Sequence, residues 1–163
     1  MKSSFRLNTE AVWFCKDYPM AAREWALKTK GLVWVSHRAV GEFLDSTGIP
    51  YFSAKGETKD GLHIYDHEGP AAMSIKAMSK GFNLQVWNKN LVMCAPSGGD
   101  VWEQMIGRTH RFGQKEGVSF VTWFTSDIVR RNFGRALLDA ENMGAITGNR
   151  QKLEIARYIE CRR

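Results

Sequence analysis

Short apolar runs alternate along most of the chain with stretches whose apolar positions recur at helical spacing. Leu32 to Ser36 is almost wholly apolar, which is typical of a strand covered on both faces. The same signature predicts further strands over Ile49–Phe52, Ala71–Ile75, Leu91–Cys94 and Val118–Phe124. Helical patterns lie at Pro19–Leu27, at Ala39–Leu44, from about Asp100, and from about Asp127 with a break near Gly144 to Gly148. This alternation predicts an α/β fold in which helices cover both faces of a mostly parallel sheet.

The composition limits the possible classes of protein but does not identify a function. The chain has 163 residues, of which 44% are apolar and 25% charged, so it is expected to fold as one domain over residues 1–163. Its apolar runs fall short of the roughly 20 residues that span a bilayer, and we expect an intracellular, cytoplasmic protein. Lys and Arg exceed Asp and Glu by 23 − 17 = 6, which favours polyanionic partners such as nucleic acid or nucleotide phosphate.

The segment from Asp100 to Gln114 carries the most informative pattern. Asp100 is expected to cap a helix, with Glu103 completing a capping box. In a helix, Gln104, Arg108 and Arg111 would share one side at spacings of four and three. Arginine suits phosphate binding because its rigid fork of donors grips two oxygens and keeps its charge at neutral pH. On spacing alone, a solvated basic helix face remains the alternative.

The string Glu-Gln-Met-Ile-Gly-Arg-Thr-His-Arg-Phe-Gly-Gln at 103–114 resembles motif VI of superfamily-two helicases, nearest the Swi/Snf-like branch. The resemblance implies a three-layer RecA-like domain, the second of two in such motors. It also implies that Arg108 and Arg111 reach the γ-phosphate of ATP bound by the first domain, with Gln104 helping to align them. Motif VI is assigned to residues near 104–114.

Two further segments resemble motifs of the same family, in the expected order. Residues 74–85 resemble motif V, although Met78 and Ser79 stand where a Gly pair is common. The resemblance places Gly81 and Asn83 toward the nucleotide. It places Ser74 and Lys76 toward nucleic acid. Without the family, Gly81 to Leu84 is a turn between two elements. Residues 32–38 resemble motif IV. Tyr51-Phe52 with Gly56-Glu57-Thr58 resembles the strand and Gly-Ser/Thr loop that follow motif IV. The resemblance assigns nucleic-acid backbone contacts to Ser36, His37 and Arg38 of the first segment and to Gly56 and Thr58 of the second.

Two parts of a complete ATPase are absent from the sequence. It contains neither a G-x-x-x-x-G-K-[S/T] phosphate loop nor an Asp-Glu pair closing an apolar strand. We therefore expect ATP and Mg²⁺ to be held mainly by an N-terminal RecA-like motor domain, in cis or in trans, and no ATP hydrolysis by this chain alone. By resemblance, Gly113-Gln114 favours DNA over RNA. The alternative is a stand-alone RecA-like module that binds nucleic acid or regulates, without motor activity.

Other chemistry-bearing residues receive weaker assignments. His63 and His67, with Asp66 or Glu68, lie in a segment that reads as a loop, so no metal site is predicted. The three widely spaced cysteines at 15, 94 and 161 are expected to be reduced and mostly structural. Core positions are predicted for Trp34, Trp102 and Trp123, while Trp13 and Trp87 are left open.

Overall fold

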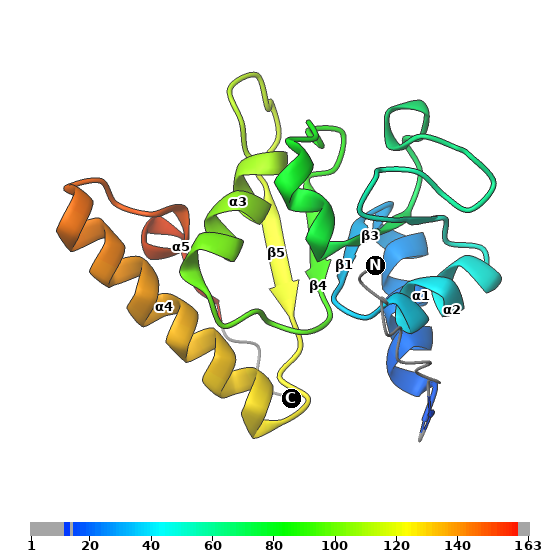
Figure 1. Cartoon of the computed structure of the whole chain (residues 1–163), viewed down its shortest axis with the longest axis horizontal. Coiled ribbons are helices and arrows are strands. Elements are labelled where there is room, and N and C mark those ends of the chain that lie inside the picture. Colours follow the sequence, from blue (N-terminus) through cyan, green and yellow to red (C-terminus); the bar gives the residue numbers. More distant parts are fainter. Residues whose placement is uncertain (1–11, 14, 160–163) are drawn as a thin grey trace, which may run out of the picture.

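The computed structural model describes residues 12–13 and 15–159, and within them five parallel strands form one sheet (Figure 1). The strand order is β2-β3-β1-β4-β5. In chain order the strands are β1 (Leu32–Val35), β2 (Tyr51–Phe52), β3 (Ala71–Ser74), β4 (Lys89–Val92) and β5 (Ser119–Thr122). Because β1 pairs with both β3 and β4, the most apolar run of the sequence occupies the centre of the sheet.

Helices cover both faces of the sheet. The first group is α1 (Asp17–Thr29) and α2 (Arg38–Ser46), and the second is α3 (Gly99–Thr109), α4 (Asp127–Thr147) and α5 (Lys152–Ile155). Figure 1 shows α4 and α5 at the opposite end of the molecule from α1 and α2. Two short 3-10 turns, η1 (Ile64–Asp66) and η2 (Ile75–Lys80), lie in the connections around β3. The predicted three-layer α/β architecture is confirmed.

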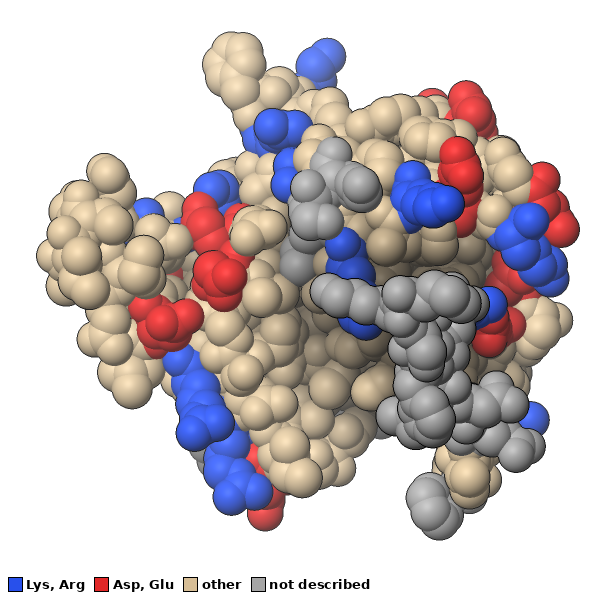
Figure 2. All heavy atoms as spheres, viewed as in Figure 1, with Lys and Arg blue, Asp and Glu red and all other residues tan. Residues whose placement is uncertain are grey.

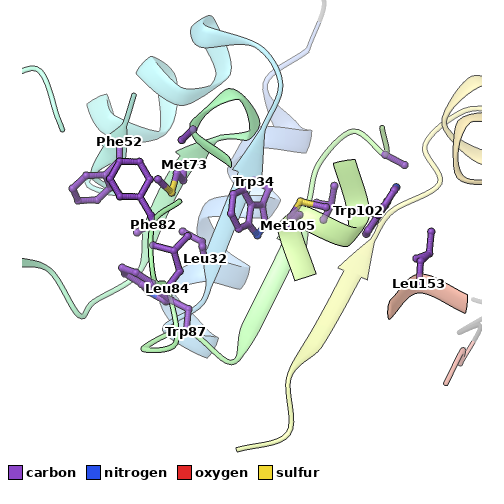
Figure 3. Close-up of a cluster of buried hydrophobic side chains, with 14 of the residues drawn as sticks. Leu32, Trp34, Phe52, Met73, Phe82, Leu84, Trp87, Trp102, Met105 and Leu153 are labelled. Atoms are coloured by element: carbon purple, nitrogen blue, oxygen red, sulfur yellow. The ribbon is translucent and has the colours of Figure 1, made fainter. Parts of the chain in front are cut away.

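The side-chain alternation of β1 divides the core into two layers. Leu32 and Trp34 join the cluster beneath α3 and α4, whereas Val33 and Val35 join the cluster beneath α1 and α2. Figure 3 shows Trp34 and Met105 close together between the sheet and α3. The buried indole of Trp34 donates a hydrogen bond to Asn90 Oδ1 at 3.0 Å. This bond satisfies two polar groups that would otherwise destabilise the core.

The sequence pattern predicts the positions of the strands and helices, but it overestimates the length and burial of the last strand. Val118–Phe124 has the strongest strand composition, yet β5 spans only Ser119–Thr122, lies at the sheet edge and is half-buried throughout. β-branched and aromatic residues favour strands at edges as well as in the core, so composition could not place it. The predicted break in the last helix is confirmed, since Gly148 ends α4 in a left-handed conformation before α5 begins.

The predicted capping box of Asp100 and Glu103 is not formed at the start of α3. Its N-cap is Gly98, without a side-chain cap, and the Gly99 N–H donates instead to the Asp139 carboxylate of α4 at 2.7 Å. The carboxylate of Glu103 accepts from the Lys152 backbone N–H at 2.5 Å and pairs with the Lys152 ammonium. Both carboxylates thus join separate helices, an arrangement that local sequence rules cannot anticipate.

The tryptophans mostly occupy interior positions. Trp34 and Trp102 are buried, as predicted, whereas Trp123 is half-buried and packs edge-on against Tyr18. Trp87 is also buried and donates to the Gly69 carbonyl at 2.8 Å, while Trp13 rests on Phe43. No helix among the described residues has both the length and the hydropathy to cross a membrane.

Candidate functional site

Arg108, at the end of α3, lies directly against the segment that resembles motif V. The Leu84 N–H donates to the Arg108 carbonyl at 2.9 Å, which joins the two segments through their backbones. Arg108 Nη1 lies 3.7 Å from the position that a Cβ would occupy on Gly81. Gly81 has a φ of +76°, so glycine provides both the conformation and the open backbone beside the guanidinium. The fold therefore brings together Gly81 and Arg108, which the sequence analysis assigned to one nucleotide site.

The two arginines differ in their surroundings. Arg108 is half-buried with its Nε atom fully covered, whereas Arg111 is exposed. The expected helical face does not extend to Arg111, because α3 ends at Thr109 and His110 leaves helical geometry with ψ at 83°. Gln104 is exposed one turn before Arg108. Arg111 is therefore positioned by a loop, and the predicted common helix face holds only for Gln104 and Arg108.

Two glutamines hold that loop in place. Gln114 Nε2 donates to the carbonyls of Gln85 and Thr109 at 2.8 and 3.2 Å. Gln85 Nε2 donates in return to the Phe112 carbonyl at 2.8 Å. A turn hydrogen bond from Gln114 N–H to the Arg111 carbonyl, 3.0 Å long, closes the loop. We call the residues of this assembly the finger surface: Gly81, Asn83, Gln85, Gln104, Arg108, Arg111 and Gln114.

Asn83 occupies the exposed rim of the finger surface. Its backbone N–H donates to the Tyr65 hydroxyl at 3.1 Å, and its side-chain amide donates to Gln85 Oε1 at 3.0 Å. Tyr65, Asn83 and Gln85 border a shallow cleft of about 190 Å³. Tyr65, Gln85 and the Gln114 side chain were not predicted from the sequence to belong to this site. A single sequence carries no signal for these contacts, because each joins positions that are far apart along the chain.

The segment that resembles motif IV ends at the carboxyl end of β1. Ser36, His37 and Arg38 are all exposed there, and the Arg38 side chain is 84% exposed although it pairs with Glu42 at 2.7 Å. Such an exposed pair contributes little to stability and leaves the guanidinium accessible to solvent. These residues begin the strand-end surface, which comprises Ser36, His37, Arg38, Gly56, Thr58, Ser74 and Lys76.

The remaining residues of the strand-end surface are less uniformly accessible. Lys76 is exposed, but only 7% of Ser74 is exposed, and its side chain hydrogen-bonds to Tyr51. Burial raises the pKa of Tyr51, and this hydrogen bond acts in the opposite direction. Thr58 is half-buried, and its hydroxyl accepts from the Leu62 N–H at 3.1 Å. Ser74 and Thr58 thus have partners within the protein.

Gly56 connects the two surfaces. It is buried with a φ of +79°, and a Cβ there would overlap the ring of Phe82 in the motif V segment. Phe82 in turn contacts the rings of His63 and Tyr65. The loop after β2 is therefore packed against the segment that carries Gly81 and Asn83.

A second, largely apolar pocket of about 240 Å³ lies at the carboxyl ends of β1 and β4. Tyr18 lies in its wall and donates a hydrogen bond to the Met93 carbonyl. Burial, with a smaller contribution from Cys94, raises the pKa of Tyr18 to about 12. Cys15, which is exposed, and Cys94, which is half-buried, both line this pocket as free thiols, and Cys161 lies outside the described residues.

Charge is distributed unevenly over the surface. Figure 2 shows basic side chains gathered over the lower part of α4, where Arg130, Arg131 and Arg135 are exposed. Further basic groups lie in the upper centre of this view, and acidic and basic groups lie side by side at its right edge. In the part of the chain that the structure describes, no three His, Cys, Asp or Glu side chains could hold a metal ion together. His67 Nε2 lies 3.0 Å from the Pro70 carbonyl, to which it can only donate.

Comparisons with known proteins identify the fold. No protein-family model matches the chain, and no curated protein does. A solved structure described as the C-terminal part of the Fun30 ATPase domain matches with a TM-score of 0.55 and 22% sequence identity, over 72% of this chain and 44% of that one. This likeness confirms a RecA-like α/β fold similar to the C-terminal part of an ATPase domain. The match spans less than half the length of the Fun30 chain.

Proposed function

We propose that this chain is the C-terminal motor domain of an ATP-dependent superfamily-two DNA helicase or translocase of the Swi/Snf-like type. The observation that carries the proposal is the position of the Arg108 guanidinium beside Gly81, with Nη1 3.7 Å from the point that a Cβ on Gly81 would occupy. The segments that resemble motifs V and VI, which the resemblance assigns to one nucleotide site, therefore lie side by side in the fold. The similarity of fold to the C-terminal part of an ATPase domain gives independent support.

The proposed chemistry is electrostatic. Phosphoryl transfer spreads negative charge over the transferred group, and fixed positive donors lower the free energy of that transition state. Arg108 and Arg111 would donate to the γ-phosphoryl oxygens and take no part in proton transfer. Gln104 would help to align the arginines. Arg108 is half-buried, and hydrogen bonds hold the loop that carries Arg111. The two side chains therefore need little rearrangement during the reaction.

The phosphate loop and the bound Mg²⁺ are assigned to an N-terminal RecA-like motor domain, either in the same polypeptide or in a separate one. When bound, Mg²⁺ neutralises charge on the β- and γ-phosphates. In this proposal, Gly81 and Asn83 join the two arginines as this chain's own contribution to ATP binding. The chain without that partner is expected to be inactive.

The strand-end surface is proposed to hold the backbone of DNA. Arg38 and Lys76 supply charge, and the exposed Ser36 and His37 supply side-chain donors. Gly56, Ser74 and Thr58 are buried or half-buried and hydrogen-bond within the protein, so the exposed residues make the first contacts with DNA. Contacts with phosphates carry no sequence information, which suits a motor that moves along any sequence. Because such contacts release counterions, affinity for DNA is expected to fall steeply with salt.

The experiment combines the chain with the phosphate-loop motor domain encoded upstream of it or beside it. Arg108→Ala and Arg111→Ala are each expected to lower the DNA-stimulated ATPase rate by about 10³-fold or more. Circular dichroism and DNA affinity should stay unchanged. Arg135→Ala on α4 is the matched control, because Arg135 is exposed and lies outside both surfaces. Full activity in both variants would refute the finger assignment.

The same experiment separates this proposal from a stand-alone binding module. Such a module would bind DNA with strong salt dependence and support no ATPase activity with the motor domain. DNA-stimulated hydrolysis that requires this chain is the outcome expected for a motor domain.

A further inference from the structure

Phe112 is the most exposed large apolar side chain among the described residues, with a relative accessibility of 106%. It lies between Arg111 and Gly113 in the loop from α3 to β5, which projects at the top of Figure 1. Single exposed hydrophobic residues are common on protein surfaces. Phe112 differs from such residues because its loop is held rigidly beside a charged group that the proposed function uses.

The loop presents Phe112 at the tip of a closed turn. The hydrogen bond from Gln114 N–H to the Arg111 carbonyl defines a four-residue turn in which Phe112 and Gly113 are the central residues. Gly113 has a φ of +95°, which favours glycine at that position. The Phe112 carbonyl accepts from Gln85, so the backbone of the turn is bound to the domain on both sides. The aromatic ring therefore projects from a preorganised support.

We infer that Phe112 is the aromatic anchor with which this domain docks into an apolar pocket of the phosphate-loop motor domain. The inference rests on the proposed function. Consecutive Cα atoms are about 3.8 Å apart, and Arg111 stands at the base of the turn whose tip is Phe112. A domain whose bound phosphate is within reach of Arg111 therefore lies close to Phe112, the next residue along the turn.

An exposed aromatic ring on an ordered turn is suited to tight docking. A buried aromatic residue at the centre of an interface is a common hot spot, and truncation of a hot spot weakens association about tenfold or more. Because the turn is already ordered, docking loses little conformational entropy in the loop. Phe112 would thus supply an apolar contact, while the adjacent Arg111 supplies charge.

A site-specific crosslink tests the contact. A photoreactive benzoylphenylalanine replaces Phe112 in the complex of this chain with the motor domain, DNA and a non-hydrolysable ATP analogue. Crosslinking to the motor domain is expected. The same group in place of Leu138 on α4 is the control, because Leu138 is exposed on a helix outside both surfaces. Crosslinks from position 112 to DNA alone, or equal crosslinking from both positions, would overturn the inference.

Kinetics test the role of the anchor in association. Phe112→Ala is expected to raise the motor-domain concentration for half-maximal ATPase activity about tenfold or more, with the saturated rate within about twofold of wild type. Phe112→Leu should restore much of the loss. Arg111→Ala should show the opposite pattern, a lost rate at saturation. Because Phe112 is fully exposed, the variants should keep the fold, which circular dichroism verifies.

The two proposals fail in different ways. If the wild-type chain supports no ATPase activity with the motor domain, the proposed function fails and the anchor fails with it. If the wild-type pair is active and Phe112→Ala leaves the half-maximal concentration unchanged, the anchor alone is refuted.

Discussion

The finger surface and the strand-end surface are built in contrasting ways. In the finger surface, Gln85 and Gln114 exchange hydrogen bonds between segments that are distant in the sequence, and Arg108 is half-buried. In the strand-end surface, Ser36, His37 and Arg38 follow a single strand and are exposed. The finger surface is thus assembled from segments that are distant in the sequence. Ser36, His37 and Arg38 of the strand-end surface simply follow the end of one strand.

The contrast matches the different demands of the two proposed tasks. Donors that stabilise a transition state must already be in place, because reorganisation during the reaction reduces their effect. Groups that hold a phosphate backbone act largely through charge and tolerate movement. A finger surface held by hydrogen bonds, and exposed side chains at Ser36, His37 and Arg38, therefore suit these tasks.

The largest expected effect comes from exchanging arginine for lysine in each surface. Arg108→Lys keeps the charge but loses the planar fork, and we expect the ATPase rate at saturating DNA to fall about 10²-fold or more. Arg38→Lys should leave that rate and the DNA affinity within about twofold, because Arg38 is proposed to act through its charge. Steady-state ATPase assays and DNA titrations at several salt concentrations measure both. Equal losses in the two variants would remove the distinction between the surfaces.

The next effect concerns the packing of Gly56 on Phe82. Gly56→Ala and Gly61→Ala both place alanine at positive φ, which costs about 1–2 kcal/mol, but only at Gly56 would the new Cβ overlap a ring. We expect Gly56→Ala to lower the free energy of unfolding by about 1–3 kcal/mol more than Gly61→Ala, as measured by urea denaturation. Removing the ring with Phe82→Ala should make the two alanine substitutions similar. Equal stability of Gly56→Ala and Gly61→Ala in the wild-type background would show that the contact is not tight.

A smaller effect is expected from the glutamine contacts. Gln114→Ala removes the donor to the Gln85 and Thr109 carbonyls, and we expect a loss of about 1–2 kcal/mol in the free energy of unfolding. Gln104→Ala on the exposed face of α3 should stay within about 0.5 kcal/mol of wild type. Hydrogen exchange of the amides from 110 to 114 should accelerate only in the first variant. Unchanged exchange would mean that the loop is held by other contacts.

The smallest effect is a pH dependence near the strand-end surface. Burial raises the pKa of Tyr18 to about 12, so the folded state favours the neutral phenol. The resulting stabilisation is complete below pH 10 and is lost as the pH rises toward 12. In Tyr18→Phe the phenol is absent, and the difference in urea midpoint between wild type and variant should narrow from pH 9 to pH 11.5. A constant difference would contradict the shift.

Several features of this protein follow from its sequence alone. The apolar run of Leu32 to Val35 determined the central strand, because a segment covered on both faces must be apolar at every position. The alternation of strand and helix patterns determined a parallel α/β sheet. The resemblance of residues 103–114 to motif VI pointed to a RecA-like fold, which the similarity to the C-terminal part of the Fun30 ATPase domain confirms.

The contacts that hold the finger surface could not be predicted from local sequence patterns. Asp139 caps α3 in place of the local carboxylate at position 100, and α3 ends before Arg111, which leaves that arginine on a loop fixed by Gln85 and Gln114. Local patterns reflect the spacing of neighbours along one element. A hydrogen bond between distant segments depends on where the whole chain has folded, and no local spacing encodes that.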